Sequence, residues 1–410
     1  MHNKSTRKKW LGLALLLSML SMLGPLNIDM YLPSFPMIAR DFGTSASLVQ
    51  LSLTSCLLGL AVGQIVIGSI SDAKGRKKPL LISISLFSIA SLICAVAPNI
   101  TILVIARFLQ GFTAAAGVVL SRAVVRDVFS GKELTKFFSV LMSINAFAPL
   151  IAPMLGGAIL LLPFAEWNTI FYTLSIIGLF VVVLMAFRLK ESLPPEKRTP
   201  SSIGHSLRTM GSLFKDRSFI GYALTVGFIH GGSFAYVAGT PFVYQDIYHV
   251  TPQVFSILFG INGIAIILGS FSIGRLSDKF SVRGLLKVAV TLALSATTIL
   301  LIMAILQGPL ATIVIPIFIF MFSIGMVVTS AFTLAMKNQG HRAGSASALV
   351  GMFPLVLGSI VAPLVGINET TAVPMGLILF VSSLIGFVVF FKFTETEQAE
   401  TSWKLKTGNS

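Results

Sequence analysis

Two ionisable residues inside long apolar stretches are the first candidates for chemistry in this sequence. They are Asp29, in the first apolar stretch, and Arg107, in the fourth. In a bilayer, either side chain would cost roughly 2.5–3.5 kcal/mol near the membrane centre, so such residues usually face a cavity or a partner. We therefore predict that Asp29 exchanges a proton or contacts a cationic group, and that Arg107 also faces a cavity or a partner.

Each of these two residues also has a simpler interpretation. Asp29 would be an interfacial residue if its helix ended there, and Arg107 would be a snorkelling arginine if it reached a membrane surface. Burial favours the neutral carboxyl of Asp29, whereas a nearby Arg107 would favour the carboxylate. The sequence leaves open which of these effects prevails.

The composition indicates the elements that must hold these residues. Hydrophobic residues make up 55% and charged residues 11% of the 410 residues, against about 25% charged residues in ordinary globular domains. This excludes a soluble enzyme and a disordered chain. A membrane-spanning helix needs about 20 apolar residues, and the stretches do not alternate as barrel strands do. We predict an all-α membrane protein with twelve spans, at 10–32, 46–70, 79–97, 100–121, 135–160, 168–189, 219–243, 252–274, 284–306, 310–335, 345–366 and 372–391.

The basic residues predict the orientation of the chain. The net charge of +15 does not indicate nucleic-acid binding, because the basic residues lie between apolar stretches rather than on one soluble face. With the N-terminus in the cytoplasm, 28 of the 30 Lys and Arg residues fall on the cytoplasmic side, as the positive-inside rule expects. Only Arg40 is then outside, and Arg107 is in a span. We expect both termini to be cytoplasmic, in a bacterial plasma membrane.

A polar connection and an internal repeat predict two halves. Gly63-x4-Gly68-x2-Ser71-Asp72 recurs as Gly269-x4-Gly274-x2-Ser277-Asp278, between the second and third spans of each half. Parallel repeats of this kind occur in transporters. We predict bundles of six helices, a linker and a tail, with these bounds: 1–189, 190–217, 218–393 and 394–410.

The connection between the second and third spans is a candidate latch. Asp72 follows Gly68 by one turn, Gly75 permits a tight reversal, and Arg76 comes next. An acidic residue near the start of a neighbouring helix would hold it through charge and helix dipole. Asp278 repeats the arrangement in weaker form. The alternative is a stop-transfer cluster of basic residues.

The fifth span carries prolines and glycines, which permit kinks and close helix approach in lipid. A static kink explains the same residues almost equally well. The two cysteines and five histidines show no metal-ligand spacing, so no metal site is expected. The helix-5 residues and the candidate cavity-lining residues are Pro149, Pro153, Gly156, Gly157, Asn27, Tyr31, Gln110, Asn145, Phe147, His230, Tyr236 and Phe332.

Several strings resemble those of a known family. Gly68…Asp72-x2-Gly75-Arg76-Lys77 resembles the loop signature of the major facilitator superfamily, and Arg107-x2-Gln110-Gly111 resembles its helix-4 motif. Pro149…Pro153-x2-Gly156-Gly157 is similar to its helix-5 antiporter motif. Asn27-Ile-Asp29-Met30-Tyr31-Leu32-Pro33 resembles the helix-1 signature of the Bcr/CflA (bicyclomycin-resistance) drug:proton antiporters.

This resemblance implies alternating access, with protons entering as drug leaves, Asp29 carrying the proton or the drug contact, and Arg107 modulating it. It implies a small-molecule substrate, no cofactor, the proton gradient as energy source and a chain working as a monomer in the lipid bilayer. A proton-coupled transporter of one metabolite is the close alternative. A channel would need rings of like charge, and a membrane enzyme would need clustered catalytic groups. The sequence shows neither.

Overall fold

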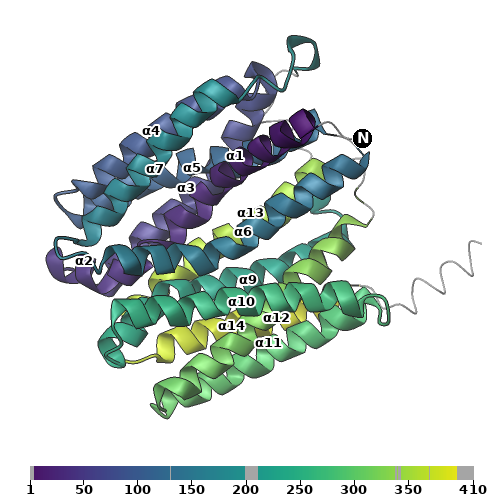
Figure 1. Cartoon of the computed structure of the whole chain (residues 1–410). Helices are drawn as coiled ribbons and strands as arrows, with labels where there is room; N and C mark the ends of the chain where they lie inside the picture. The colour runs from purple at the N-terminus through teal and green to yellow at the C-terminus, as the bar shows by residue number, and fades with distance from the viewer. Residues whose placement is uncertain are drawn as a thin grey trace, which may run out of the picture.

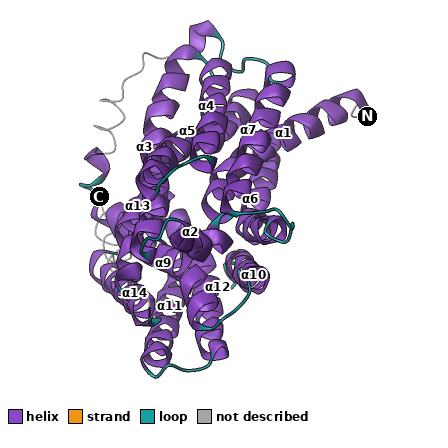
Figure 2. Cartoon of the chain, turned by 90° about the vertical axis from the view of Figure 1, so that its left-hand side faces the viewer, coloured by secondary structure: helices purple, strands orange, loops and turns teal. Residues whose placement is uncertain are grey.

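Long α-helices form the architecture, and the described residues contain no strand (Figure 2). The structure is a computed structural model that describes residues 4–129, 131–198, 211–337, 339, 343–368 and 370–394. The long helices are α1 (Lys4–Asp29), α3 (Ala46–Lys74), α4 (Lys77–Ala95), α5 (Ile100–Val128), α6 (Gly131–Ile159), α7 (Trp167–Arg188), α9 (Arg217–Phe242), α10 (Pro252–Leu276), α11 (Val282–Ile305), α12 (Leu310–Met336), α13 (Ala343–Val361) and α14 (Val373–Phe393). The short elements are η1 (Leu32–Ser34), α2 (Phe35–Asp41), η2 (Pro195–Lys197), η3 (Val243–Ile247) and η5 (Ala362–Ile367).

The length and apolar character of the helices confirm the predicted fold class, an all-α membrane protein. Each predicted span overlaps one long helix, and 10 helical stretches within the described residues are long and apolar enough to cross a membrane. Helices α6 and α9 are not among these 10 stretches, but they overlap the remaining two predicted spans, 135–160 and 219–243. A helix satisfies its own backbone hydrogen bonds, which is why apolar stretches of this length adopt it in lipid.

The packing repeats between the first and second halves of the chain. In the first half α3 packs against α5 and α4 against α7; in the second half α10 packs against α12 and α11 against α14. The two sets lie on opposite sides of the molecule, with α6 and α13 between them (Figure 1). Helix α6 crosses to pack against α10, and α13 packs against α3. The domain bounds stay predictions, and residues 199–210 and 395–410 of the predicted linker and tail lie outside the described residues.

Several helix ends differ from the predicted spans. Helix α1 ends at Asp29 rather than at residue 32, and the chain turns through η1 and α2. Pro33 explains this, because it has no N–H to donate to the carbonyl of Asp29 and its ring clashes with that carbonyl, so the α-helix cannot continue. At the other end of the molecule α3 continues to Lys74 and α5 to Val128. Polar residues expected in connections therefore lie on helices, which fixes their side chains in space.

Candidate functional site

Arg107 is at the centre of a buried polar cluster between α1, α3, α4 and α5. One Nη1 atom donates to Oδ1 of Asn27 (2.6 Å) and to Oε1 of Gln110 (2.5 Å), and Nη2 donates to the Asn27 backbone carbonyl (2.9 Å). Nε2 of Gln110 donates to Oγ of Ser91 (2.7 Å), and Nδ2 of Asn27 donates to Sγ of Cys56 (3.0 Å). We call these five residues the Arg107 cluster. It brings together three sequence-predicted residues, Asn27, Arg107 and Gln110.

No acidic side chain of the described residues pairs with the Arg107 guanidinium. Its side chain is 0% exposed, so it does not reach a membrane surface as a snorkelling arginine would. The guanidinium carbon lies 4.1 Å from the ring centroid of Tyr31 and 5.6 Å from that of Phe171. Desolvated contacts of this kind contribute about 2 kcal/mol or more. Neutral acceptors and aromatic faces thus compensate for the several kcal/mol that burying a charge costs.

Asp29 is buried but stands apart from this cluster. It is the last residue of α1, but it is 7% exposed and the chain continues through η1 and α2, so it is not the interfacial helix-end residue of the simpler interpretation. Within the described residues, no hydrogen bond or ion pair reaches its carboxyl group. Residues two positions apart point to different sides of a helix, so Asn27 faces Arg107 while Asp29 faces elsewhere. Arg107 is therefore not the counter-ion of Asp29.

Asp29 lies between the Arg107 cluster and the second half of the chain. It is within electrostatic range of Cys56 on α3 and of Tyr236 on α9. The Tyr236 hydroxyl accepts a hydrogen bond from Nδ2 of Asn262 on α10 (2.8 Å), and both side chains are 2% exposed. The η1 turn that follows Asp29 packs against α9 and α10, so the end of α1 lies where the two halves meet.

The other predicted cavity residues do not join this region. The His230 ring stacks on Phe234, with centroids 6.2 Å apart, and the side chain is half-buried. Phe147 and Phe332 are exposed and do not line the cavity found below. The Asn145 side chain lies outside the described residues. The substrate roles of these four residues stay predictions.

A second polar group, the Arg76 network, surrounds Arg76 at the opposite end of the helices. Arg76 is 4% exposed; its Nη1 donates to Asp72 (2.5 Å) and Ser71 (2.7 Å), and its Nε donates to Asp127 (2.8 Å). Burial alone would lower the pKa of Arg76, but the hydrogen bonds and charges of Asp127 and Asp72 raise it above its ordinary value. The guanidinium therefore stays charged and ties the end of α3 to the end of α5.

Glu191, after α7, caps the start of α4. Its carboxylate accepts from the backbone N–H of Arg76 (2.8 Å), Lys77 (3.1 Å) and Leu193 (3.0 Å). Partial burial opposes its ionisation, but these bonds and that from Ser192 prevail and lower its pKa. Gly75 has φ +87°, and a Cβ there would lie 2.7 Å from Oε2 of Glu191. Only glycine fits this reversal, as its position in the sequence predicts.

The second copy of the loop pattern does not form such a network. Asp278 is exposed, and no ion pair joins it to a described residue. Arg275 lies over the ring of Phe271 (4.3 Å), and Arg283 donates to the backbone carbonyl of Thr394 (3.2 Å). The expectation that Asp278 repeats the first arrangement in weaker form is therefore wrong for the described residues, because Arg275 and Arg283 are directed to other partners.

The helix-5 motif lies within α6, which continues as a helix through Pro149 and Pro153. A side chain at Gly156 would collide with the backbone carbonyl of Met30, and one at Gly157 with Oγ of Ser256. The glycine pair thus lets α6 approach the end of α1 on one side and α10 on the other. This places the motif at the contact between the halves, next to Asp29.

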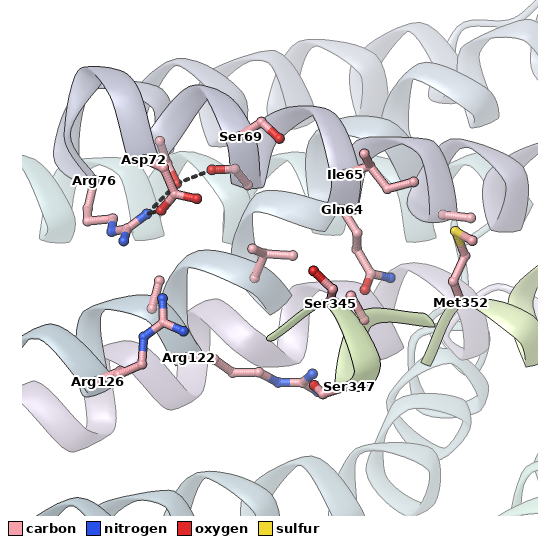
Figure 3. A pocket seen from close by; sticks show the side chains of 16 residues that line it. Gln64, Ile65, Ser69, Asp72, Arg76, Arg122, Arg126, Ser345, Ser347 and Met352 are labelled. Atoms are coloured by element: carbon pink, nitrogen blue, oxygen red, sulfur yellow. Dashed lines mark hydrogen bonds and ion pairs between the residues drawn. The ribbon is translucent and has the colours of Figure 1, made fainter. Parts of the chain in front are cut away.

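A cavity of about 400 Å³ lies between α3, α5 and α13, beside the Arg76 network. Gln64, Asp72 and Arg76 line one side, and Arg122 and Arg126 of α5 line another (Figure 3). Ser345, Ser347 and Met352 of α13 complete it. Asp72 and the first turns of α13 thus face a common space, the arrangement that a latch between them requires.

The opposite end of the molecule is closed by contacts between the halves. Arg40 of α2 forms an ion pair with Asp246 of η3 (3.5 Å). Nε2 of Gln50 donates to the Ala238 carbonyl (3.1 Å), and Nε2 of Gln245 donates to the Pro33 carbonyl (3.1 Å). The cavity and these contacts lie at opposite ends of the helices, so the structure is open toward one side and closed toward the other.

Sequence reasoning missed several of these residues. Arg122, Arg126 and Asp127 fall beyond the predicted span 100–121, whereas the apolar stretch 123–125 between them carries α5 on to Val128. Glu191 was missed because nothing in the local sequence marks a carboxylate that caps another helix. Arg40 and Asp246 are 206 residues apart in the chain. Their charges were visible, but only the packing of the halves pairs them.

Comparison with known proteins agrees with this architecture. The chain is 68% identical over 402 residues to the uncharacterized MFS-type transporter YdgK of Bacillus subtilis, covering 98% of this chain and 100% of that protein. It is 32% identical over 381 residues to a bicyclomycin resistance protein homolog of Haemophilus influenzae, covering 93% of this chain and 95% of that protein. The fold matches the xylose transporter XylE from E. coli in a partially occluded inward-open conformation, with a TM-score of 0.74, 15% identity and coverage of 95% and 99%.

The Major Facilitator Superfamily model matches residues 15–363. The relatives are transporters, which agrees with the interpretation that the chain is not an enzyme, and the bicyclomycin-resistance relative agrees with the Bcr/CflA resemblance of the first helix. A multi-pass transporter in the membrane is thereby established. The chain belongs to the Major Facilitator Superfamily.

Proposed function

We propose that this chain exports small amphipathic compounds, including drugs, from a bacterial cell in exchange for protons. The observation that carries the proposal is the Asp29 carboxyl group, buried at the contact between the halves with no hydrogen-bond or ion-pair partner among the described residues. An ionised carboxylate without a partner is costly in such a place. The group would hold a proton while enclosed and release it when the halves separate and water enters.

The two ends of the molecule support alternating access. In the structure the end with Arg40 and Asp246 is closed, while the end with Asp72 and Arg122 contains the cavity. With both termini in the cytoplasm, this is the state that faces inward. One charge moving through 100 mV supplies about 2.3 kcal/mol, which is enough for a concentration ratio of roughly 50.

The experiment measures drug-induced proton release from purified protein in detergent, with chloramphenicol and a sulfonamide as probes. The parent should release protons when a substrate is added. Asp29→Asn should release none while retaining binding of the neutral probe, and Asp29→Glu should keep part of the signal. Glu166→Gln, a change at an exposed carboxyl group outside the site, is the matched control. Unchanged proton release by Asp29→Asn would overturn the role of Asp29.

The orientation is tested separately by labelling single introduced cysteines. Asn99→Cys should react with a membrane-impermeant reagent from outside intact cells, and Lys190→Cys only after the cells are opened. Background labelling is expected to be low because Cys56 and Cys94 are buried. Labelling of Lys190→Cys from outside would reverse the topology and with it the direction of transport.

A further inference from the structure

The cavity beside α13 has a chemical character that the proposed function does not specify. Two of its lining residues, Arg122 and Arg126, lie four positions apart on α5 and are both exposed. Side chains at this spacing are neighbours on one helix face. Both labelled side chains lie along the cavity, and Arg122 extends toward Ser347 of α13 (Figure 3). We call Arg122 and Arg126 the arginine pair.

The arginine pair has no acidic partner within the described part of the chain. Among the described residues, Arg76 forms ion pairs at this end with Asp72 and Asp127. Asp127, the neighbour of Arg126 in sequence, also accepts from Ser192 (3.2 Å). The acids that could neutralise the pair are thus committed elsewhere. Two adjacent like charges repel each other, and an anion placed between them would relieve that repulsion.

The remaining lining suits a molecule with an apolar body. Ile65, Val119 and Met352 offer apolar surface, while Gln64, Ser345 and Ser347 offer polar groups. The first turns of α13 also present the positive end of a helix dipole to the same space. A guanidinium binds carboxylate, sulfonate or phosphate oxygens through paired hydrogen bonds. The cavity therefore combines a site for one negative group with an apolar wall.

We infer that this cavity binds amphipathic anions, with the arginine pair holding the negative group and the apolar wall holding the body. This deepens the proposed function, on which it rests for the direction of transport, by naming a substrate class. The same chemistry occurs in free organic anions and in the headgroups of anionic lipids. The experiment separates these two sources.

The primary test compares two dyes that share a ring system. 1-Anilinonaphthalene-8-sulfonate carries a sulfonate, and N-phenyl-1-naphthylamine lacks it. Binding is measured by fluorescence to the purified chain in nanodiscs of phosphatidylcholine. The double change Arg122→Gln with Arg126→Gln should weaken binding of the sulfonated dye about tenfold, as loss of charged hydrogen bonds predicts, and leave the neutral dye unchanged. Changing both residues to Lys should give an intermediate loss.

The matched control is Arg188→Gln, which removes an exposed positive charge at the end of α7, outside the cavity. It should bind both dyes as the parent does. A second measurement needs no variant. On the parent, added sodium sulfate should weaken binding of the sulfonated dye and spare the neutral one. The inference would be overturned if the Gln changes or sulfate weakened binding of both dyes equally. It would also be overturned if neither treatment altered binding of the sulfonated dye.

Nanodiscs that contain phosphatidylglycerol identify the source of the anion. If this lipid reduces sulfonated-dye binding by the parent but not by the Gln variant, the pair holds lipid headgroups. If it has no effect, the pair is open to free anions. Proton-driven transport of both dyes in proteoliposomes then tests the proposed function independently. If the neutral dye is transported but binding of the sulfonated dye does not depend on the arginine pair, only this inference is wrong. If binding of the sulfonated dye depends on the pair but neither dye is transported, only the efflux proposal is wrong.

Discussion

Arg107 holds Asn27 twice, once through the side-chain amide oxygen at 2.6 Å and once through the backbone carbonyl at 2.9 Å. The pair joins α5 to the last turn of α1, where the backbone carbonyl has no continuing helix to bond it. Asp29, two residues later, is thereby set in place without touching the arginine. Arg107 is thus a positioning residue, which holds the end of α1 against the first half.

Arg107→Lys should nearly abolish transport, because a lysine cannot hold both oxygens of Asn27 and also contact Gln110. Asn27→Ala should be milder, since the backbone carbonyl remains; we expect destabilisation by about 1.5–3 kcal/mol. Thermal unfolding in detergent and transport in proteoliposomes measure the two effects. Thr298→Val, which removes a hydroxyl bonded only within its own helix, is the control. Equal losses in the two variants would contradict the double contact.

The Arg76 network predicts an order among variants at the end of α3. Arg76→Gln leaves the carboxylates of Asp72 and Asp127 without their shared cation, so transport and stability should both fall, the latter by up to about 3–5 kcal/mol. Adding Asp127→Asn should recover part of the stability, because one acid is then neutral. Lys74→Gln, an exposed cation next to the network, should behave as the parent. Thermal unfolding ranks the variants, and no recovery in the double variant would argue against the shared cation.

The ion pair between Arg40 and Asp246 should affect accessibility more than stability. Its side chains are 71% and 42% exposed, and exposed pairs contribute about 0–1 kcal/mol. Arg40→Ala should therefore leave the melting temperature nearly unchanged but speed labelling of Val365→Cys, which is buried at the closed end. Exchanging the two charges should restore slow labelling. Labelling that is equally slow in Arg40→Ala would show that the other contacts close this end alone.

Glu191 gives a pH dependence. Partial burial would raise its pKa, but hydrogen bonds from backbone N–H groups to the carboxylate hold the pKa below the ordinary 4.5 in the folded chain. A group whose pKa is lowered on folding stabilises the fold above its unfolded value and loses that contribution as pH falls through the folded value. The difference in melting temperature between the parent and Glu191→Gln should thus be full at neutral pH and shrink in acid. A difference independent of pH would contradict the capping role.

Local composition was enough to predict the membrane class, the approximate helical spans and the residues with chemistry. The apolar stretches are as long as a bilayer is thick, and only helices satisfy their own backbone there, so local composition was sufficient. Asp29 and Arg107 could be identified as candidate functional residues because each is an isolated charge among apolar neighbours. Gly75 was also predictable, because a reversal between two helices requires a backbone conformation that glycine adopts freely.

Which of these groups meet depends instead on how the helices pack. Asp29 and Arg107 invited pairing because they are the two opposite charges in apolar stretches, yet the angular step along α1 turns Asn27, not Asp29, toward the arginine. The arginine pair on α5 can be recognised as a candidate anion site only because α13 encloses a cavity beside it. A contact between distant segments depends on helix rotation and on the approach of the two halves. Those are properties of the packed whole, and no local stretch of sequence encodes them alone.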